Sequence, residues 1–212
     1  MARVMKRRTV LSGVGAATFS FGAMRAWAAP ASDETIPGFA PEVFGRLTTP
    51  RPLPTASIQD EQGRDIPLSH WQGAPFILHI WATWCPPCIA ELPSVDAVAR
   101  AFGASSPVIV PVAVRGSTVA KVRSFYGKHG ITSLPVYVDP VSALLIETAD
   151  QDALTQASKQ SDPDWSKHPV SRQGIPRTII VDASGRIVAE NLGEMRWDPD
   201  SVRRTVAQLT HS

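Results

Sequence analysis

Cys85 and Cys88 are the only cysteines in this chain of 212 residues, and two residues separate them. A thiolate is a nucleophile, and two sulfurs this close along the chain can close a disulfide and open it again. A purely structural bridge is a poor alternative, because a bridge over two intervening residues constrains almost no chain. The spacing therefore predicts redox chemistry, with Cys85 as an exposed nucleophile and Cys88 as the resolving thiol.

The cysteines follow an apolar run, residues 76–80, that predicts a buried strand, and they precede apolar residues at helical spacing that reach Phe102. Pro86 suits the first position of that helix, so a Cys85 thiolate would lie at the positive end of the helix dipole. Pro86 and Pro87 lack an N–H, which leaves the Cys88 N–H as the main local donor. We therefore expect a pKa of Cys85 that is only moderately lowered, and a reducing couple nearer about −270 mV than about −120 mV.

The motif Trp-Ala-Thr-Trp-Cys-Pro-Pro-Cys at residues 81–88, followed by Glu-Leu-Pro at 91–93, resembles the TlpA/ResA group of thioredoxin-fold thiol–disulfide oxidoreductases. The resemblance extends from about Thr55 to the C-terminus, with one long insertion. A second cysteine pair, which a zinc site needs, is missing from the sequence, and Ile89 stands where a haem-attachment motif needs His.

The resemblance implies further site residues. Glu91 lies three residues after Cys88, on the same helix face, and matches the carboxylate that tunes the cysteines and moves protons in this family; a first-turn Glu that serves only the helix dipole is the alternative. Pro176 matches the cis-proline that faces the disulfide. Ile175 would then offer backbone groups to an extended client chain, and Trp84 would be a flat apolar contact for partners.

His79 departs from the family pattern. It lies six residues before Cys85, where thioredoxins carry a buried Asp and this group often carries Asn. A buried neutral imidazole could accept a proton from Cys88 and act as a relay. A lone His in an apolar run could equally be a hydrogen-bonded core residue, and the sequence leaves both interpretations open.

Residues 1–28 have the features of an export signal. They contain five basic residues and no acidic one, with Lys6-Arg7-Arg8 before a weakly apolar stretch and Ala26-Trp27-Ala28 as a cleavage site. The adjacent arginines resemble a twin-arginine signal and predict a periplasmic protein; an uncleaved anchor facing the periplasm is the alternative. Without this segment the net charge changes from +2 to −3, so nothing in the remainder indicates a nucleic-acid partner.

Six prolines in residues 29–54 indicate a spacer of extended character, although Phe39, Phe44 and Leu47 could pack on the domain as an arm. The hydrophobic content of 43% is enough for one domain with a sizeable core.

We expect that domain to span residues 55–212. Strands alternate with helices there and end in a hairpin and a helix, which predicts an α/β, thioredoxin-like fold: a central mixed sheet, helices on both faces and an N-terminal hairpin extension. An insertion at about 140–174 interrupts it. This insertion is either a solvated loop or a recognition element that presents Trp165.

These observations together predict an exported protein-disulfide reductase that needs no cofactor and no resident metal. The family resemblance implies clients such as apocytochrome c haem-site cysteines or copper-site assembly proteins, and a membrane electron donor that restores the dithiol. Two alternatives stay open. One is a Cu(I) metallochaperone that uses both thiolates, for which His168 is the only candidate third ligand near the site; the other is a thiol oxidant, which the Pro-Pro pair disfavours.

Overall fold

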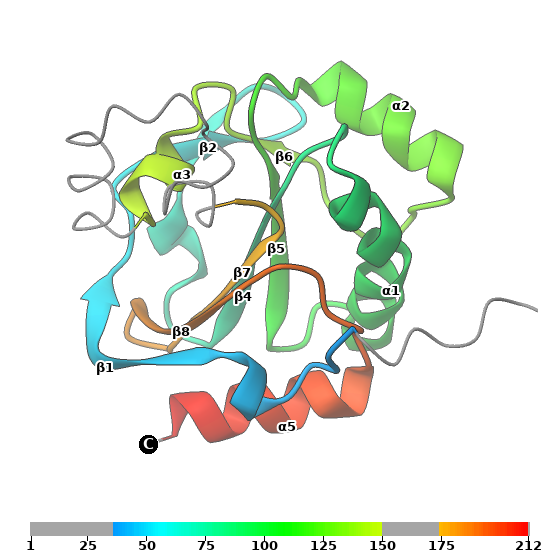
Figure 1. Cartoon of the computed structure of the whole chain (residues 1–212). Helices are drawn as coiled ribbons and strands as arrows, with labels where there is room; N and C mark the ends of the chain where they lie inside the picture. The colour runs from blue at the N-terminus through cyan, green and yellow to red at the C-terminus, as the bar shows by residue number, and fades with distance from the viewer. Residues whose placement is uncertain (1–35, 150–173, 212) are drawn as a thin grey trace, which may run out of the picture. The chain divides into compact units, whose positions relative to one another are not determined.

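The computed structural model describes residues 36–149 and 174–211 (Figure 1). Within these residues eight strands form one mixed sheet in the order β1-β8-β7-β4-β5-β6-β2-β3. At its centre β4 (Phe76–Trp81), β5 (Val108–Ala113) and β6 (Tyr137–Val138) run parallel. The strand β7 (Arg177–Val181) is antiparallel to β4, and β8 (Arg186–Leu192) is antiparallel to β7. The predicted α/β fold class with a mixed sheet is confirmed.

The two edges of the sheet are built from the N-terminal part of the domain. On one side, a single turn η1 (Pro41–Val43) leads into β1 (Gly45–Pro52), which pairs antiparallel with β8. On the other side, β2 (Ser57–Gln59) and β3 (Asp65–Pro67) form an antiparallel hairpin that joins the sheet beside β6. This hairpin, which is followed by the turn η2 (Leu68–Trp71), is the predicted N-terminal extension.

Helices cover both faces of the sheet (Figure 1). The helices α1 (Pro86–Phe102), α2 (Val119–His129) and α5 (Pro199–Thr210) contribute buried side chains to one core cluster, which also contains both cysteines. The short helix α3 (Ala143–Glu147) contributes to a second cluster on the other face. Because both faces are covered, all six residues of β4 are buried. The strand therefore holds His79 at the centre of the molecule.

The described part of the predicted spacer, residues 36–54, belongs to the domain, so the spacer interpretation is wrong there. The ring of Phe39 is 1% exposed and lies 4.8 Å from the ring of Trp197, which fixes the chain to the core. The prolines do not prevent strand formation, because Pro50 and Pro52 lie on the edge strand β1, where a missing N–H removes no bond from the interior of the sheet.

The strand β6 is short and covers only Tyr137–Val138. The preceding loop is held by another interaction instead: the Asp96 carboxylate accepts hydrogen bonds from three consecutive backbone N–H groups, those of residues 132–134, at 3.1, 2.6 and 3.1 Å. Groups that bind a carboxylate on α1 are not free to pair with β5. Sequence periodicity does not reveal this contact, because it joins segments that are far apart in the chain.

Among the described residues, no helix has the length and apolar character needed to cross a membrane. Several predictions from the sequence concern segments outside the described residues. They concern the export signal at 1–28, the beginning of the predicted spacer, and most of the insertion, including Trp165 and His168.

Candidate active site

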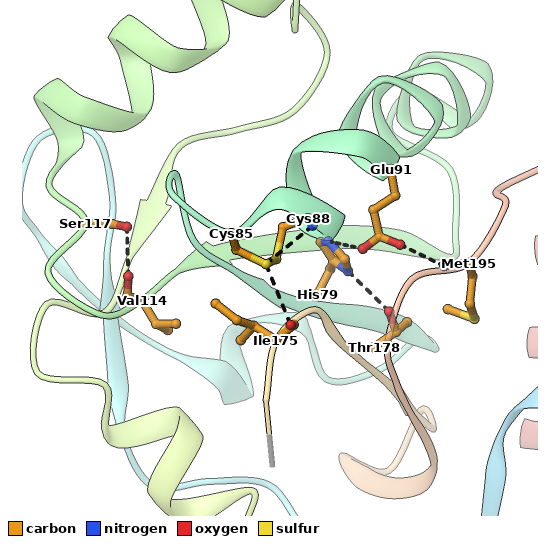
Figure 2. The surroundings of a disulfide bond; sticks show 9 residues. All are labelled: His79, Cys85, Cys88, Glu91, Val114, Ser117, Ile175, Thr178 and Met195. Carbon is orange, nitrogen blue, oxygen red and sulfur yellow. Dashed lines mark hydrogen bonds and ion pairs between the residues drawn. A yellow bond between two sulfur atoms is a disulfide. The ribbon is translucent and has the colours of Figure 1, made fainter. Parts of the chain in front are cut away.

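Cys85 is the residue that caps the N-terminus of α1, and it forms a disulfide with Cys88 (Figure 2). The backbone N–H of Cys88 donates a hydrogen bond to Cys85 Sγ at 3.4 Å. Pro86 and Pro87 occupy the first two positions of the helix and have no N–H to add. The expectation that the Cys88 N–H is the local donor to Cys85 is therefore confirmed.

The two cysteines differ in exposure less than the sequence predicts. Cys85 is 3% exposed and Cys88 is fully buried, so the prediction of an exposed nucleophile holds only relative to its partner. The reason is a loop from another part of the chain: the carbonyl oxygen of Ile175 lies 3.6 Å from Cys85 Sγ (Figure 2). In the disulfide this sulfur has no proton to donate, and a hydrogen bond to the carbonyl becomes available only when Cys85 is a thiol.

The residues that the sequence predicts to contact a client lie around Cys85. The Ile175–Pro176 peptide bond is cis, as the family resemblance implies. The side chain of Trp84 is 56% exposed, and its indole N–H donates to the carbonyl oxygen of Arg115 at 3.4 Å. This hydrogen bond holds a flat apolar surface next to Cys85. Trp81, by contrast, is fully buried.

Behind the disulfide, a chain of polar contacts joins two strands, the helix α1 and the segment between β8 and α5 (Figure 2). His79 Nδ1 on β4 lies 3.2 Å from Thr178 Oγ1 on β7, and His79 Nε2 lies 3.2 Å from Glu91 Oε1 on α1. The other carboxyl oxygen, Glu91 Oε2, accepts a hydrogen bond of 2.9 Å from the backbone N–H of Met195. The structure thus brings together Glu91 and His79, two residues that the sequence singles out separately.

Local structure explains this arrangement. The antiparallel register of β4 and β7 pairs His79 directly with Thr178. On α1, Cys88 and Glu91 are both buried, since residues three apart share one face of a helix. Glu91 therefore points into the protein with the cysteine rather than into solvent, where a residue serving only the helix dipole would lie.

Burial dominates the electrostatics of this pair. It raises the pKa of Glu91 to about 8. The negative charge of Glu194 also raises this pKa, whereas hydrogen bonds from the Met195 N–H and the Trp197 indole lower it. Burial also lowers the pKa of His79 to about 3. At neutral pH the carboxyl group is therefore protonated and the imidazole neutral. Near neutral pH most of the Glu91 carboxyl can therefore give a proton, and only its ionised minority can accept one.

Sequence reasoning missed three members of this region: Thr178, Met195 and Trp197. Trp197 packs edge-on to the His79 ring, with 5.4 Å between ring centroids. The only signal for Thr178 is its place in the strand that pairs with β4, and that signal requires the register. Met195 acts through its backbone N–H, which leaves no trace in the residue type.

The described residues, 36–149 and 174–211, contain no group of three or more His, Cys, Asp or Glu side chains that could hold a metal ion. The Cu(I) interpretation stays an untested prediction, since its candidate third ligand, His168, lies outside those residues.

Comparison with known proteins gives consistent results. A sequence model of the Redoxin family matches residues 49–209. The chain is 29% identical over 134 residues to the thiol-disulfide oxidoreductase ResA of Geobacillus thermodenitrificans (strain NG80-2), an alignment that covers 63% of each chain. It is 21% identical over 141 residues to the ResA protein of Bacillus anthracis, covering 66% of this chain and 68% of that one.

Solved structures share the fold. A secreted thiol-disulfide isomerase from Corynebacterium glutamicum superposes with a TM-score of 0.53 at 21% identity, covering 80% of this chain and 92% of that one. A DsbF homologue from Corynebacterium diphtheriae gives a TM-score of 0.51 at 20% identity, covering 79% and 92%.

Fold and chemistry thus agree on the class: this is a thiol–disulfide oxidoreductase, a redox enzyme of thioredoxin-like fold that works through a Cys-x-x-Cys disulfide. Because the family model spans well over half of its length, the chain belongs to the Redoxin family.

Proposed function

We propose that the protein acts as a reductase of disulfides in extracytoplasmic client proteins. The observation that supports this direction is the sparse donor set at Cys85: the structure gives its sulfur one N–H donor, from Cys88, in a helix that begins with two prolines. A thiolate with few donors is stabilised weakly. Weak stabilisation of the reduced form makes the dithiol a better electron donor.

The exchange runs in two steps. The Cys85 thiolate attacks one sulfur of the client disulfide, the client S–S bond breaks, and the second client sulfur leaves as a thiolate. Cys88 then loses its proton and attacks Cys85 Sγ, so that the enzyme disulfide forms and the first client sulfur leaves. Two electrons pass from the enzyme dithiol to the client, and two protons end on the client thiols.

Glu91 and His79 are the proposed proton partners of Cys88. Their side chains contact each other behind the disulfide, and Glu91 shares the buried face of α1 with Cys88. When Cys88 must become a nucleophile, an adjacent group that accepts its proton speeds the step. When a donor later reduces the enzyme disulfide, the same pair returns the proton.

The proposed client contacts are the backbone of Ile175 and the indole of Trp84. An extended segment next to the client cysteine can pair with the exposed backbone of the cis-proline loop, in the manner of strand addition. The exposed indole then packs on the client side chains. The resemblance to the TlpA/ResA group supports apocytochrome c haem-site cysteines or copper-site assembly proteins as clients, with a membrane protein as the electron donor.

We also propose that residues 1–28 export the protein by the twin-arginine route to the periplasm. The paired arginines and the Ala-x-Ala site support this location. We propose a catalytic domain over residues 55–212, extended at its N-terminal end by residues 36–54 and interrupted by an insertion at about 140–174.

Three measurements test the proposal. Equilibration with glutathione buffers should give a midpoint nearer about −270 mV than about −120 mV, and the reduced protein should precipitate insulin by cleaving its disulfides. In cells, a Cys88→Ser variant should retain mixed disulfides through Cys85, and mass spectrometry of the captured proteins names the clients. A midpoint at the oxidising end together with no insulin reduction would contradict the reductase assignment.

A further inference from the structure

An open cleft of about 440 Å³ lies between α2 and Thr83, a residue that precedes Cys85 by two positions. Figure 1 shows α2 next to the start of α1, the end of the helix that carries the disulfide. Lys121 and Lys128 both line this cleft. They are the only lysines in residues 36–149 and 174–211, so every lysine that the structure describes lies beside the active site.

Helix geometry explains why the two lysines share the cleft. Lys121 and Lys128 are two helical turns apart on α2, so they lie on the same face of the helix, about 10 Å from each other along its axis. Ser124 and the buried ring of Phe125 lie between them in the helix and also line the cleft. The cleft thus presents an apolar and hydroxyl-lined surface with an ammonium group near each end.

The two ammonium groups have no carboxylate partner among the residues that the structure describes. Lys121 Nζ donates one hydrogen bond, of 3.1 Å, to the carbonyl oxygen of Gly116, and an ammonium group has three N–H donors. Arg123, between the lysines in sequence, does pair with a carboxylate, that of Glu61 at 3.2 Å. Residues 97–138 contain no Asp or Glu, so α2 and its flanking loops supply no negative charge to the cleft.

This positive cleft is a local exception. Without residues 1–28 the chain has a net charge of −3, so the protein as a whole does not attract anions. We infer that the cleft binds acidic side chains of an extended client segment next to the client disulfide, and so selects clients by charge. The inference rests on the proposed function, because it names the class of client that the reductase prefers.

The spacing of the lysines fits an extended chain. Such a chain rises about 3.3 Å per residue, so the separation of about 10 Å along α2 corresponds to about three client residues. Two acidic side chains at this spacing can reach both ammonium groups at once. Exposed ion pairs each contribute little to affinity, but complementary charge speeds the encounter and disfavours partners of the same charge. The expected result is a preference among clients rather than tight binding.

Three synthetic peptides test the inference. Each contains one intramolecular disulfide and the same sequence, except that two flanking positions, about three residues apart, are both Glu, both Gln or both Lys. The reduced wild-type protein should reduce the Glu peptide with a kcat/KM about tenfold above that of the Gln peptide, and the Lys peptide most slowly. The preference should disappear at about 1 M salt, because salt screens exposed charges. Equal rates for the three peptides at low salt would overturn the inference.

Charge reversal provides the matched variants. Lys121→Glu combined with Lys128→Glu should invert the order, so that the Lys peptide becomes the best client, a result that loss of folding cannot produce. Arg203→Glu combined with Arg204→Glu changes the net charge equally on α5, where Arg203 donates to the carbonyl oxygen of Ala101 near the far end of α1. This control should keep the wild-type order. An unchanged order in the lysine variant, or equal inversion in both variants, would overturn the inference.

Failure of the proposed function looks different. If the enzyme works only as an oxidant, the reduced protein reduces none of the three peptides, whatever their charge. The oxidised protein then oxidises their dithiol forms, and the same order of Glu, Gln and Lys peptides should hold, because the cleft acts on binding and not on the direction of electron transfer. Equal oxidation rates for the three dithiol peptides would overturn the inference in that case.

Discussion

The two sides of the disulfide differ in their exposure to solvent and in the kind of groups that line them. The client side (Trp84, Cys85 and Ile175) presents an exposed indole and a backbone carbonyl, with Cys85 Sγ just below the surface. The proton side (His79, Glu91 and Trp197) is buried and made of titratable and polar groups, which strands, helix α1 and a loop hold in place. We propose from this difference that client recognition and proton transfer are separate tasks, so a substitution on one side should leave the other side intact.

The largest expected effect tests how the proton side is held in place. Phe39→Ala removes a ring that packs against Trp197 and Phe44, so the free energy of unfolding should fall by about 3 kcal/mol because a cavity replaces the ring. Urea unfolding measures this change, and Phe39→Leu should recover most of the loss. A loss below about 1 kcal/mol would show that residues 36–44 do not support the proton side.

Glu91→Gln should act on proton transfer alone. Ellman's reagent places a thionitrobenzoate group on Cys85, and attack by Cys88 releases it. Gln keeps the shape and polarity of the side chain but cannot accept the Cys88 proton, so release of thionitrobenzoate from Cys85 should slow by about a hundredfold near neutral pH. The rate at which Cys85 first attacks Ellman's reagent should stay unchanged, because that step belongs to the client side. If both rates fell equally, the proposed separation of the two sides would be wrong.

The buried pair also predicts a pH dependence of stability. The folded-state pKa of Glu91, about 8, lies above its ordinary value of 4.5, so the stability that this group contributes is complete below pH 4.5 and is lost as the pH rises through 8. The folded-state pKa of His79, about 3, lies below its ordinary 6.5, so its contribution is complete above pH 6.5 and is lost as the pH falls.

Between pH 4.5 and 6.5 the two slopes cancel, because the folded and unfolded pairs each bind about one proton. From pH 6.5 to 8 only the folded pair keeps its proton, and the free energy of unfolding should fall by about 2 kcal/mol. Denaturant unfolding of the oxidised protein across this range measures the fall. Glu91→Gln should abolish it, and an equally steep fall in that variant would assign it to other groups.

The smallest effect is expected on the client side. Trp84→Ala removes an exposed apolar contact, so kcat/KM for a protein client should fall about tenfold. The release of thionitrobenzoate from Cys85 should keep its rate and pH profile, since the small probe does not need the indole. A changed pH profile would connect Trp84 to the proton side and contradict the comparison.

The sequence predicts the client side better than the proton side, and the reason is physical. The motif around Cys85 is local: a strand, two prolines and a helix start determine where the sulfur lies and which N–H it meets. Pro176 is distant in sequence but belongs to a recognisable motif. The contact between His79 and Glu91 depends instead on strand register and helix rotation, and the role of Met195 depends on a backbone N–H that no residue type reveals.

The same contrast between local and long-range contacts explains which parts of the fold the sequence predicts. Alternating strands and helices predict the sheet and its helices, because hydrophobic periodicity is a local property. The arm at residues 36–54 looks like a spacer because its prolines dominate the composition, yet Phe39 and an edge strand attach it to the domain. Burial of one aromatic ring against Trp197 is a long-range contact that composition does not record.

The central claim is that Cys85 reacts first and Cys88 completes the exchange. It is tested most directly by reducing the protein, labelling it with limiting iodoacetamide across a range of pH and locating the label by mass spectrometry. The account predicts that Cys85 is labelled first, with Cys88 protected until the protein unfolds. Labelling of Cys88 first, or of neither cysteine in the folded reduced protein, would contradict it.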